Sequence, residues 1–408
     1  MVGGITIRKS ALPLIFLSLL LSVASCPAQE ENQTSFNESQ TTPNESEVFW
    51  WNTPDNKGQE ESEFVDESYD FYSYYEDAPA EEPISLAVPV ADLNGDLASD
   101  ILVLEIANDP ETNAFSTVIS AMGGSDGATL WQKEYTDGIA IPYPAEDLNG
   151  DGLSDVVIDL IIAGTNFIPY SELAALQGYD GAEIWSRPHL LAATFAYPVK
   201  DTTGDNATDL VEHLFGIDSL NGSLVTKISS IDGSNGTEIG SSVFPGAVAI
   251  EYPAGNFTSD SIQDSITAAY KIDGDSGENI SSAIAAKSGL DREELWNISL
   301  MDSLAIAVPV QDISGDGLDD LLVYMMSNNT TVTFEMAAIQ GIDGQMLWRK
   351  SSGESLAIAF VGPDLTGDGA RDLMVYKLDQ SGASETEAVK GDDGSILWTK
   401  PMMIFIPQ

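Results

Sequence analysis

Apolar and polar positions alternate in short runs along residues 84–401, and the same arrangement returns every 52–56 residues. In the fifth unit, apolar runs cover 304–310 and 321–326, an alternating run covers 331–339, and a last short run covers 345–349. Runs of this length, separated by turns rich in Gly and Asp, predict β-strands. Four strands in a unit of this size are typical of a β-propeller blade.

Two marks recur in the units and set their spacing. One is a nine-residue loop that opens with Asp or Asn, and the other is a position near the end of the unit that is usually Trp. The interval from the Trp position to the next loop is 16 residues at all five junctions, whereas 34–40 residues separate a loop from the following Trp position. The constant interval fits the crossing between blades, and the variable one fits an exposed hairpin between the second and third strands. The loops open at Asp92, Asp147, Asp201, Asn256, Asp312 and Asp364, and the second mark lies at Trp131, Trp185, Gly240, Trp296, Trp348 and Trp398.

Six such units predict an all-β protein, a β-propeller of six four-stranded blades that covers residues 84–408. A further apolar run at 402–407 resembles the start of a seventh inner strand. This run either pairs with residues before Ile84 to close the ring or completes a seventh blade with the aromatic segment that precedes the first unit. Seven blades are therefore the alternative to six.

The nine-residue loop is the strongest chemical signal in the chain. Calcium takes about six to eight oxygen ligands, from carboxylates, other side-chain oxygens and backbone carbonyls. Side chains at loop positions 1, 3, 5 and 9 supply such oxygens, position 7 offers its carbonyl, and Gly at position 6 permits a sharp turn. We expect several structural Ca²⁺ ions. The predicted ligands are Asp92, Asn94, Asp96 and Asp100; Asp147, Asn149, Asp151, Leu153 and Asp155; Asp201, Thr203, Asp205 and Asp209; Asp260 and Asp264; Asp312, Ser314, Asp316, Leu318 and Asp320; and Asp364, Thr366, Asp368, Ala370 and Asp372.

The six loops are not equally complete. Position 6 is Gly in the second, fifth and sixth loops, but it is Leu97 in the first and Asn206 in the third. The fourth loop opens with Asn256 and also lacks this Gly, so it is the weakest candidate. Mg²⁺ is the second choice of ion because it demands stricter octahedral geometry. The alternative to any ion is a set of metal-free turns, in which converging carboxylates would repel one another.

Two motifs carry a resemblance to known families. The loops resemble those of FG-GAP/VCBS repeats in integrin-α-like propellers, which implies Ca²⁺ between the first two strands of a blade. The Gly-x-Asp-Gly-x-x-Leu-Trp segments at 341–348 and 391–398 resemble the Trp-docking motif of quinoprotein-like (PQQ-type) repeats. PQQ enzymes of that family usually have eight blades and a vicinal Cys pair, whereas this chain has six units and no Cys after Cys26. We therefore expect no PQQ, and tryptophans that pack between blades.

Charge and composition narrow the function further. The chain has 65 acidic and 16 basic residues, a formal net charge of −49. Nucleic acid and anionic lipid need a basic surface, so we expect neither as a partner. The two histidines, His189 and His213, occupy unrelated positions in two units, and no nucleophile–base set emerges. We expect no enzyme, although a hydrolase or lyase that uses only carboxylates stays open.

The first 83 residues predict export. Residues 1–25 have basic residues ahead of a short apolar stretch, as in a signal peptide. Val23, Ala24 and Ser25 before Cys26 resemble a lipobox, which predicts lipidation of Cys26 and a membrane anchor. Ordinary cleavage after Ala28 and free secretion is the alternative. Residues 26–83 are acidic, carry three of the eleven Asn-x-Ser/Thr sequons and predict a tether. The sequons also predict a glycoprotein.

These features together predict an exported, cell-surface, calcium-binding β-propeller that serves as a binding or adhesion module. Its partner would be a protein or a glycan at the cell surface. The alternatives are an enzyme that acts on polysaccharide and a structural component of the cell envelope that associates with itself.

Overall fold

The computed structural model describes residues 83–402 apart from 110–113, 164–168, 219–221, 261, 274–278, 329–331, 380 and 382. The predicted signal peptide, Cys26, nearly all of the tether and residues 403–407 of the last apolar run lie outside the described residues. The predictions about them therefore stay predictions.

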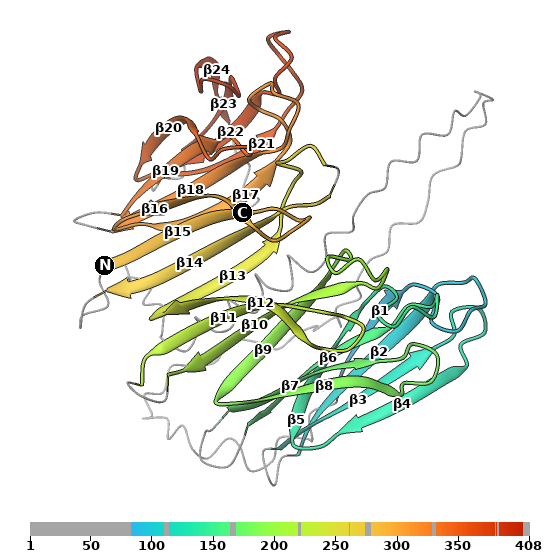
Figure 1. Ribbon diagram of the computed structural model, residues 1–408. Coiled ribbons are helices and arrows are strands. Elements are labelled where there is room, and N and C mark those ends of the chain that lie inside the picture. The colour runs from blue at the N-terminus through green and yellow to red at the C-terminus, as the bar shows by residue number, and fades with distance from the viewer. Residues whose placement is uncertain are drawn as a thin grey trace, which may run out of the picture. The chain divides into compact units, whose positions relative to one another are not determined.

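The described residues form 24 strands and no helix. The strands make six antiparallel sheets of four, and within each sheet they pair in chain order (Figure 1). The first three blades hold β1 (Ile84–Val90), β2 (Asp100–Asp109), β3 (Ala114–Met122) and β4 (Thr129–Tyr135); β5 (Gly138–Pro144), β6 (Val156–Ala163), β7 (Pro169–Leu176) and β8 (Glu183–Leu190); and β9 (Ala192–Val199), β10 (Asp209–Ile217), β11 (Leu224–Ile231) and β12 (Glu238–Pro245).

The last three blades repeat this plan. They hold β13 (Ala247–Pro253), β14 (Ser265–Asp273), β15 (Asn279–Lys287) and β16 (Glu294–Leu300); β17 (Leu304–Val310), β18 (Asp320–Asn328), β19 (Val332–Ile339) and β20 (Met346–Gly353); and β21 (Leu356–Val361), β22 (Leu373–Leu378), β23 (Ser384–Val389) and β24 (Ile396–Met402). The prediction of an all-β fold built from six four-stranded blades is confirmed, and the four runs read from the fifth unit are β17 to β20.

The hydrophobic core lies between consecutive blades, where the third strand of one sheet contacts the first strand of the next. Five clusters of buried apolar side chains fill the five junctions of the described chain. Position 2 of the acidic loop contributes to four of them, through Leu93, Leu148, Phe257 and Ile313, all fully buried. Because each sheet buries its face on its neighbour, the blades stabilise one another.

The repeated tryptophans dock on the next blade. The indole Nε1 of Trp131 donates a hydrogen bond of 2.6 Å to the carbonyl oxygen of Gly178, in the turn between β7 and β8. Trp185, Trp296 and Trp348 make the same bond to Gly233, Gly341 and Gly391. Each ring also covers the glycine three residues later, and a Cβ on Gly181 would lie 2.8 Å from the ring of Trp131. The predicted packing of tryptophans between blades is confirmed at these four positions.

The last tryptophan differs from the other four. Trp398 is 40% exposed, whereas Trp131 is 7% exposed. The matching turn of the first blade contains Gly127, and among the described residues no atom lies within 4 Å of the place where its Cβ would be. Among the described residues, Trp398 is therefore not docked as the other four tryptophans are.

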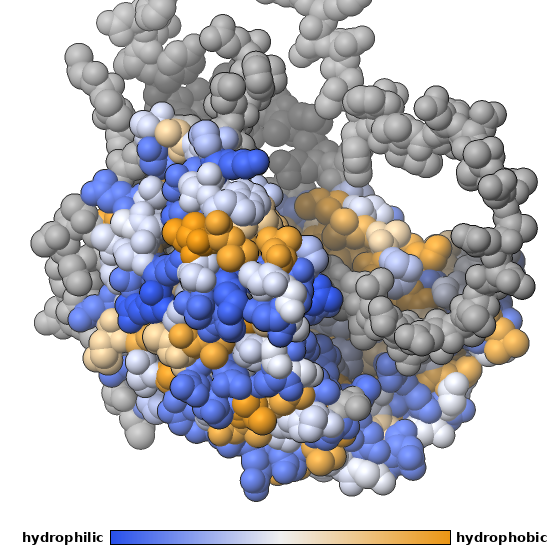
Figure 2. Space-filling view, turned by 90° about the horizontal axis from the view of Figure 1, so that it is seen from above, coloured by the Kyte–Doolittle hydropathy of each residue, from blue (hydrophilic) through white to orange (hydrophobic). Residues whose placement is uncertain are grey.

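Exposed apolar side chains occur on the first strands of the fifth and sixth blades. Ile306, Val308, Ile358 and Phe360 are each 39–59% exposed. The face drawn in Figure 2 shows hydrophobic residues lying among hydrophilic ones. Within the described part of the chain, no helix is long and apolar enough to cross a membrane.

Candidate cation-binding loops

All six acidic loops occupy the same place in their blades. Each joins the first strand to the second, as 147–155 joins β5 to β6 and 312–320 joins β17 to β18. The turn that receives a Trp joins the third strand to the fourth and therefore lies at the same end of the blade. The second strand ends and the third begins at the opposite end of the blade, because neighbouring strands are antiparallel.

The Asp at position 1 organises the loop through backbone N–H groups. In the second loop, Oδ1 of Asp147 accepts from the N–H groups of Asn149, Gly150 and Asp151 at 3.2, 2.6 and 3.1 Å. Its Oδ2 accepts from Gly152 at 2.7 Å. Asp92, Asp201, Asp312 and Asp364 accept bonds in the same way. The N–H of Gly369, with others of its loop, lowers the pKa of Asp364, so this carboxylate is ionised.

Positions 3 and 5 turn their oxygens into the loop as well. Oδ1 of Asn149 accepts from the N–H of Asp151, and Oδ1 of Asp151 accepts from the N–H of Leu153, both at 2.9 Å. A carboxylate oxygen has two lone pairs, so an oxygen that accepts one N–H bond keeps capacity for another partner. The loop backbone is therefore set by its own side chains.

The Asp at position 9 joins the loop to the Trp-docking turn of its own blade. Oδ2 of Asp155 accepts from the N–H of Leu148 at 2.9 Å, and Oδ1 accepts from the N–H of Gly178 at 3.1 Å. Burial raises the pKa of Asp155 to about 6, the two N–H bonds act in the opposite direction, and the carboxylates of Asp151 and Asp147 add to the rise. The same pair of bonds recurs at Asp100, Asp209, Asp264, Asp320 and Asp372. The sequence analysis did not foresee this bridge, although the recurrent Gly of the turn was a signal for it.

The type of residue at position 6 separates the stronger loops from the weaker ones, because this position has a left-handed backbone. Position 6 is left-handed in Gly152, Gly317 and Gly369, and also in Leu97 and Asn206, with φ of 69° and 68° for the last two. Leu97 is thus forced into a conformation that costs about 1 kcal/mol or more for a residue with a Cβ. In the fourth loop, Oδ1 of Asn256 accepts longer bonds from described residues, from Thr258 at 3.3 Å and Ser259 at 3.0 Å.

The donor set of the loops fits a hard cation. It consists of carboxylate, amide, hydroxyl and carbonyl oxygens, without the sulfur or imidazole ligands that zinc and copper prefer. Asp147 and Asp151 lie near enough to Asp155 to raise its pKa, which is the electrostatic environment that a bound cation relieves. Among the described residues, no three His, Cys, Asp or Glu side chains already stand in a metal-binding cluster. The loops therefore bring oxygen ligands near one another without forming a closed coordination shell.

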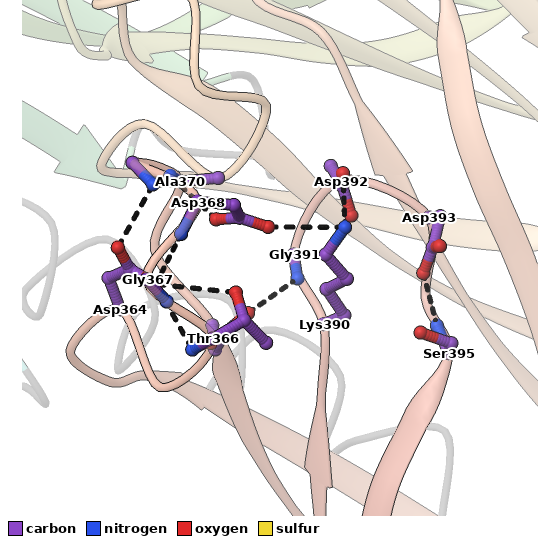
Figure 3. Close-up of polar contacts among 12 residues, drawn as sticks. Asp364, Thr366, Gly367, Asp368, Ala370, Lys390, Gly391, Asp392, Asp393 and Ser395 are labelled. Carbon is purple, nitrogen blue, oxygen red and sulfur yellow. Dashed lines mark hydrogen bonds and ion pairs between the residues drawn. The ribbon is translucent and has the colours of Figure 1, made fainter.

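A lysine side chain contacts the sixth loop from the turn between β23 and β24. Nζ of Lys390 lies 3.1 Å from Oδ2 of Asp368, at loop position 5, and 2.8 Å from Oδ2 of Asp392 (Figure 3). Hydrogen bonds to Asp392 and Asp368 raise the pKa of Lys390 above its ordinary value. In the fifth loop the equivalent position is Gln340, whose Nε2 donates to Oδ2 of Asp316 at 2.7 Å.

A second polar network lies at the junctions of the third blade and contains both histidines. Glu212 pairs with Arg187 at 3.1 Å and with Nε2 of His189 at 2.7 Å. Nε2 of His213 accepts from the backbone N–H of Glu251 at 2.8 Å. Burial lowers the pKa of His213 to about 4, so its imidazole is neutral near pH 7.

Glu251 replaces a small residue on the inner strand and is fully paired. It binds Lys287 at 3.0 Å, Ser265 at 2.8 Å and Arg292. Burial raises the pKa of Glu251, but Arg292 and Lys287 outweigh it and hold that pKa at about 2. Arg292 stands where four other turns have the glycine beneath a docked Trp, and the preceding blade has Gly240 in place of Trp. An ion pair thus replaces the usual Trp–Gly contact at this junction.

Comparison with known proteins finds only distant similarity to solved structures. No family model and no curated protein matches the chain, so the resemblance of its loops to FG-GAP/VCBS and PQQ-type repeats stays a prediction. The rhamnogalacturonan lyase PL11 of Bacillus licheniformis is 12% identical, with a TM-score of 0.37 over 80% of this chain and 70% of that chain. The Dos1 propeller is 10% identical, with a TM-score of 0.34 over 76% and 74%. An apocarotenoid oxygenase mutant of Synechocystis is 12% identical, with a TM-score of 0.32 over 78% and 72%. The chain is an all-β protein whose six sheets match a six-bladed β-propeller.

Proposed function

We propose that this chain is an exported, cell-surface β-propeller whose acidic loops bind several Ca²⁺ ions and which serves as a binding or adhesion module. The observation that carries the proposal is the recurrence of one loop geometry in five of the blades. In each of these loops an Asp at position 1 collects backbone N–H groups, and a second Asp at position 9 bonds to the turn between the third and fourth strands. Turns alone do not need this repeated set of acidic side chains.

Calcium in these loops would stabilise the folded chain. An ion that binds the folded loop and not the unfolded chain adds its binding free energy to folding. Gly178 connects this stabilisation of the loop to the contact between blades. Its N–H donates to Asp155, and its carbonyl accepts from Trp131 of the preceding blade. Ion binding in the second loop therefore supports the junction between the first and second blades.

The binding surface for a partner would lie away from the calcium loops. The connections between the second and third strands vary in length in the sequence, and these strands end and begin at the opposite end of each blade. Exposed apolar side chains in the first half of the inner strands, such as Ile306 and Ile358, add contact area of the kind found at interaction sites. The net charge of −49 favours a neutral or basic partner, such as an uncharged glycan or a basic protein surface.

The test combines metal analysis with partner capture on the full-length chain. We expect several Ca²⁺ ions per chain, and binding to a protein or glycan array that EDTA abolishes. Turnover of a polysaccharide would favour the enzyme alternative, and ordered self-association in calcium without another ligand would favour the envelope alternative. Absence of bound calcium at millimolar concentration would refute the proposal.

A further inference from the structure

One turn position faces position 5 of the acidic loop in both the fifth and the sixth blade. Gln340 and Lys390 each directly precede the glycine that receives a Trp, Gly341 and Gly391. Gln340 donates to Asp316 at 2.7 Å, and Lys390 reaches Asp368 at 3.1 Å. The two contacts are equivalent in the fold, but the donor is a neutral amide in one and an ammonium in the other.

The two loops are matched at positions 1, 3, 4, 5, 6 and 9 in the type of residue or in its bonds. Oδ1 of the first Asp accepts from the N–H of position 4 at 2.6 Å in both, from Gly315 in the fifth loop and from Gly367 in the sixth. Position 6 is a left-handed glycine in both, with φ of 91° at Gly317 and 96° at Gly369. Position 3 is a hydroxyl residue in each loop. Position 8 does differ, with Asp319 in the fifth loop, where its Oδ2 accepts from the N–H of Asn256 at 2.9 Å, and Arg371 in the sixth. The charge of the turn residue is the difference that contacts the side chain at position 5.

That difference acts directly on a predicted ligand. An ammonium within hydrogen-bond distance of a carboxylate supplies a counter-ion and repels a second cation brought to the same oxygen. The affinity of an oxygen-ligand site for calcium depends on the number of charges that the ligands carry. Lys390 adds one positive charge beside the sixth loop, and Asp392 on its other side holds it in the turn.

We propose that Lys390 is a built-in counter-ion that lets the sixth loop keep its fold without calcium, so that this loop binds Ca²⁺ more weakly than the fifth. The inference rests on the proposed calcium binding of the loops, and it identifies the sixth as the complete loop with the lower calcium affinity. The residue before the docking glycine therefore decides which cation balances the loop. Gln340 leaves this role to a calcium ion in the fifth loop, whereas the ammonium of Lys390 fills it in the sixth.

A reciprocal exchange in the full-length chain tests this inference. Lys390→Gln gives the sixth loop the turn residue of the fifth, and Gln340→Lys does the reverse. We expect Lys390→Gln to tighten one calcium site by about tenfold or more and Gln340→Lys to weaken one site by a similar factor, both measured by calorimetric titration and bound-metal analysis. In EDTA, Lys390→Gln lowers the midpoint of thermal unfolding and added calcium restores it.

Two controls separate the local effect from others. Lys390→Arg keeps the charge, so its calcium binding should match the parent chain. Lys377→Gln removes a lysine of the same blade that pairs with Glu387 and not with the loop, and it controls for net charge. Calcium binding that is unchanged in both exchange variants, while Asp316→Asn still loses one site, would overturn the role of Lys390 alone. Absence of calcium binding in the parent chain would overturn the proposed function and this inference together.

Discussion

Trp131 and Asp155 bond to the same residue from two different blades. The indole of Trp131 donates to the carbonyl oxygen of Gly178 at 2.6 Å, and Oδ1 of Asp155 accepts from the N–H of Gly178 at 3.1 Å. One glycine thus connects an acidic loop of the second blade to the outer strand of the first. The same arrangement recurs at Gly233, Gly341 and Gly391. Loop order and blade packing are therefore coupled in this fold.

The bridging Asp should matter with and without metal. Asp155→Asn weakens two buried hydrogen bonds to a charged acceptor, so we expect a loss of about 2–4 kcal/mol in the free energy of unfolding in EDTA. The same variant should bind one calcium ion fewer. Asp260→Asn, in the weak fourth loop, should change neither quantity by much. Urea unfolding and metal analysis of both variants check this, and equal effects would contradict the ranking of the loops.

The docked tryptophans should carry more stability than the last one. Trp348 is 8% exposed and Trp398 is 40% exposed. We expect Trp348→Ala to cost about 3–5 kcal/mol, as for large buried aromatics, and Trp398→Ala to cost less. Equilibrium unfolding of the two variants measures the difference. An equal cost would show that Trp398 is buried in solution, and the turn of the first blade that contains Gly127 is then the natural place for its ring.

Two glycines with the same backbone conformation give a matched test of the Trp contact. Gly344 and Gly127 both have φ near 70°, at 71° and 69°. A Cβ on Gly344 would lie 2.7 Å from the ring of Trp296, whereas nothing in the described chain lies within 4 Å of one on Gly127. Gly127→Ala should cost about 1 kcal/mol for the backbone alone, and Gly344→Ala about 1–3 kcal/mol more because the ring must move. Similar losses in thermal unfolding would contradict the docking.

Stability should depend on pH through His213. Its folded pKa of about 4 lies below the value of about 6.5 for the unfolded chain, so the unfolded chain binds more protons between these values. This contribution is fully present above about pH 6.5 and is lost as the pH falls towards 4, at most about 3 kcal/mol.

His213→Gln removes the titration and keeps an acceptor for the N–H of Glu251. The parent chain should therefore lose stability relative to this variant as the pH falls from 7 to 4.5, measured by urea unfolding at each pH. The comparison at equal pH cancels the opposite contribution of Asp159, whose pKa burial raises to about 8. A constant difference between the two chains would show that His213 is not held neutral.

The repeat pattern was enough to predict the blades. It did not predict the hydrogen bonds between residues that are far apart in the sequence. The runs at 304–310 and 331–339 correspond to β17 and β19 because alternation and turn residues act locally. The bond between Asp155 and Gly178 spans 23 residues, and that between Trp131 and Gly178 spans 47, so only the folded sheets bring them together. Aligning the six turns would have shown Arg292 in a glycine position and Lys390 before another glycine, but not the partners of either residue.

Thermal unfolding of the full-length chain in EDTA and in millimolar calcium, with the bound metal counted, tests the central claim most directly. We expect a large rise in the unfolding midpoint with calcium and several ions per chain, with the sixth loop the weakest of the complete ones. An unchanged midpoint and no bound metal would contradict the claim, and the acidic loops would then be turns that join the strands and nothing more.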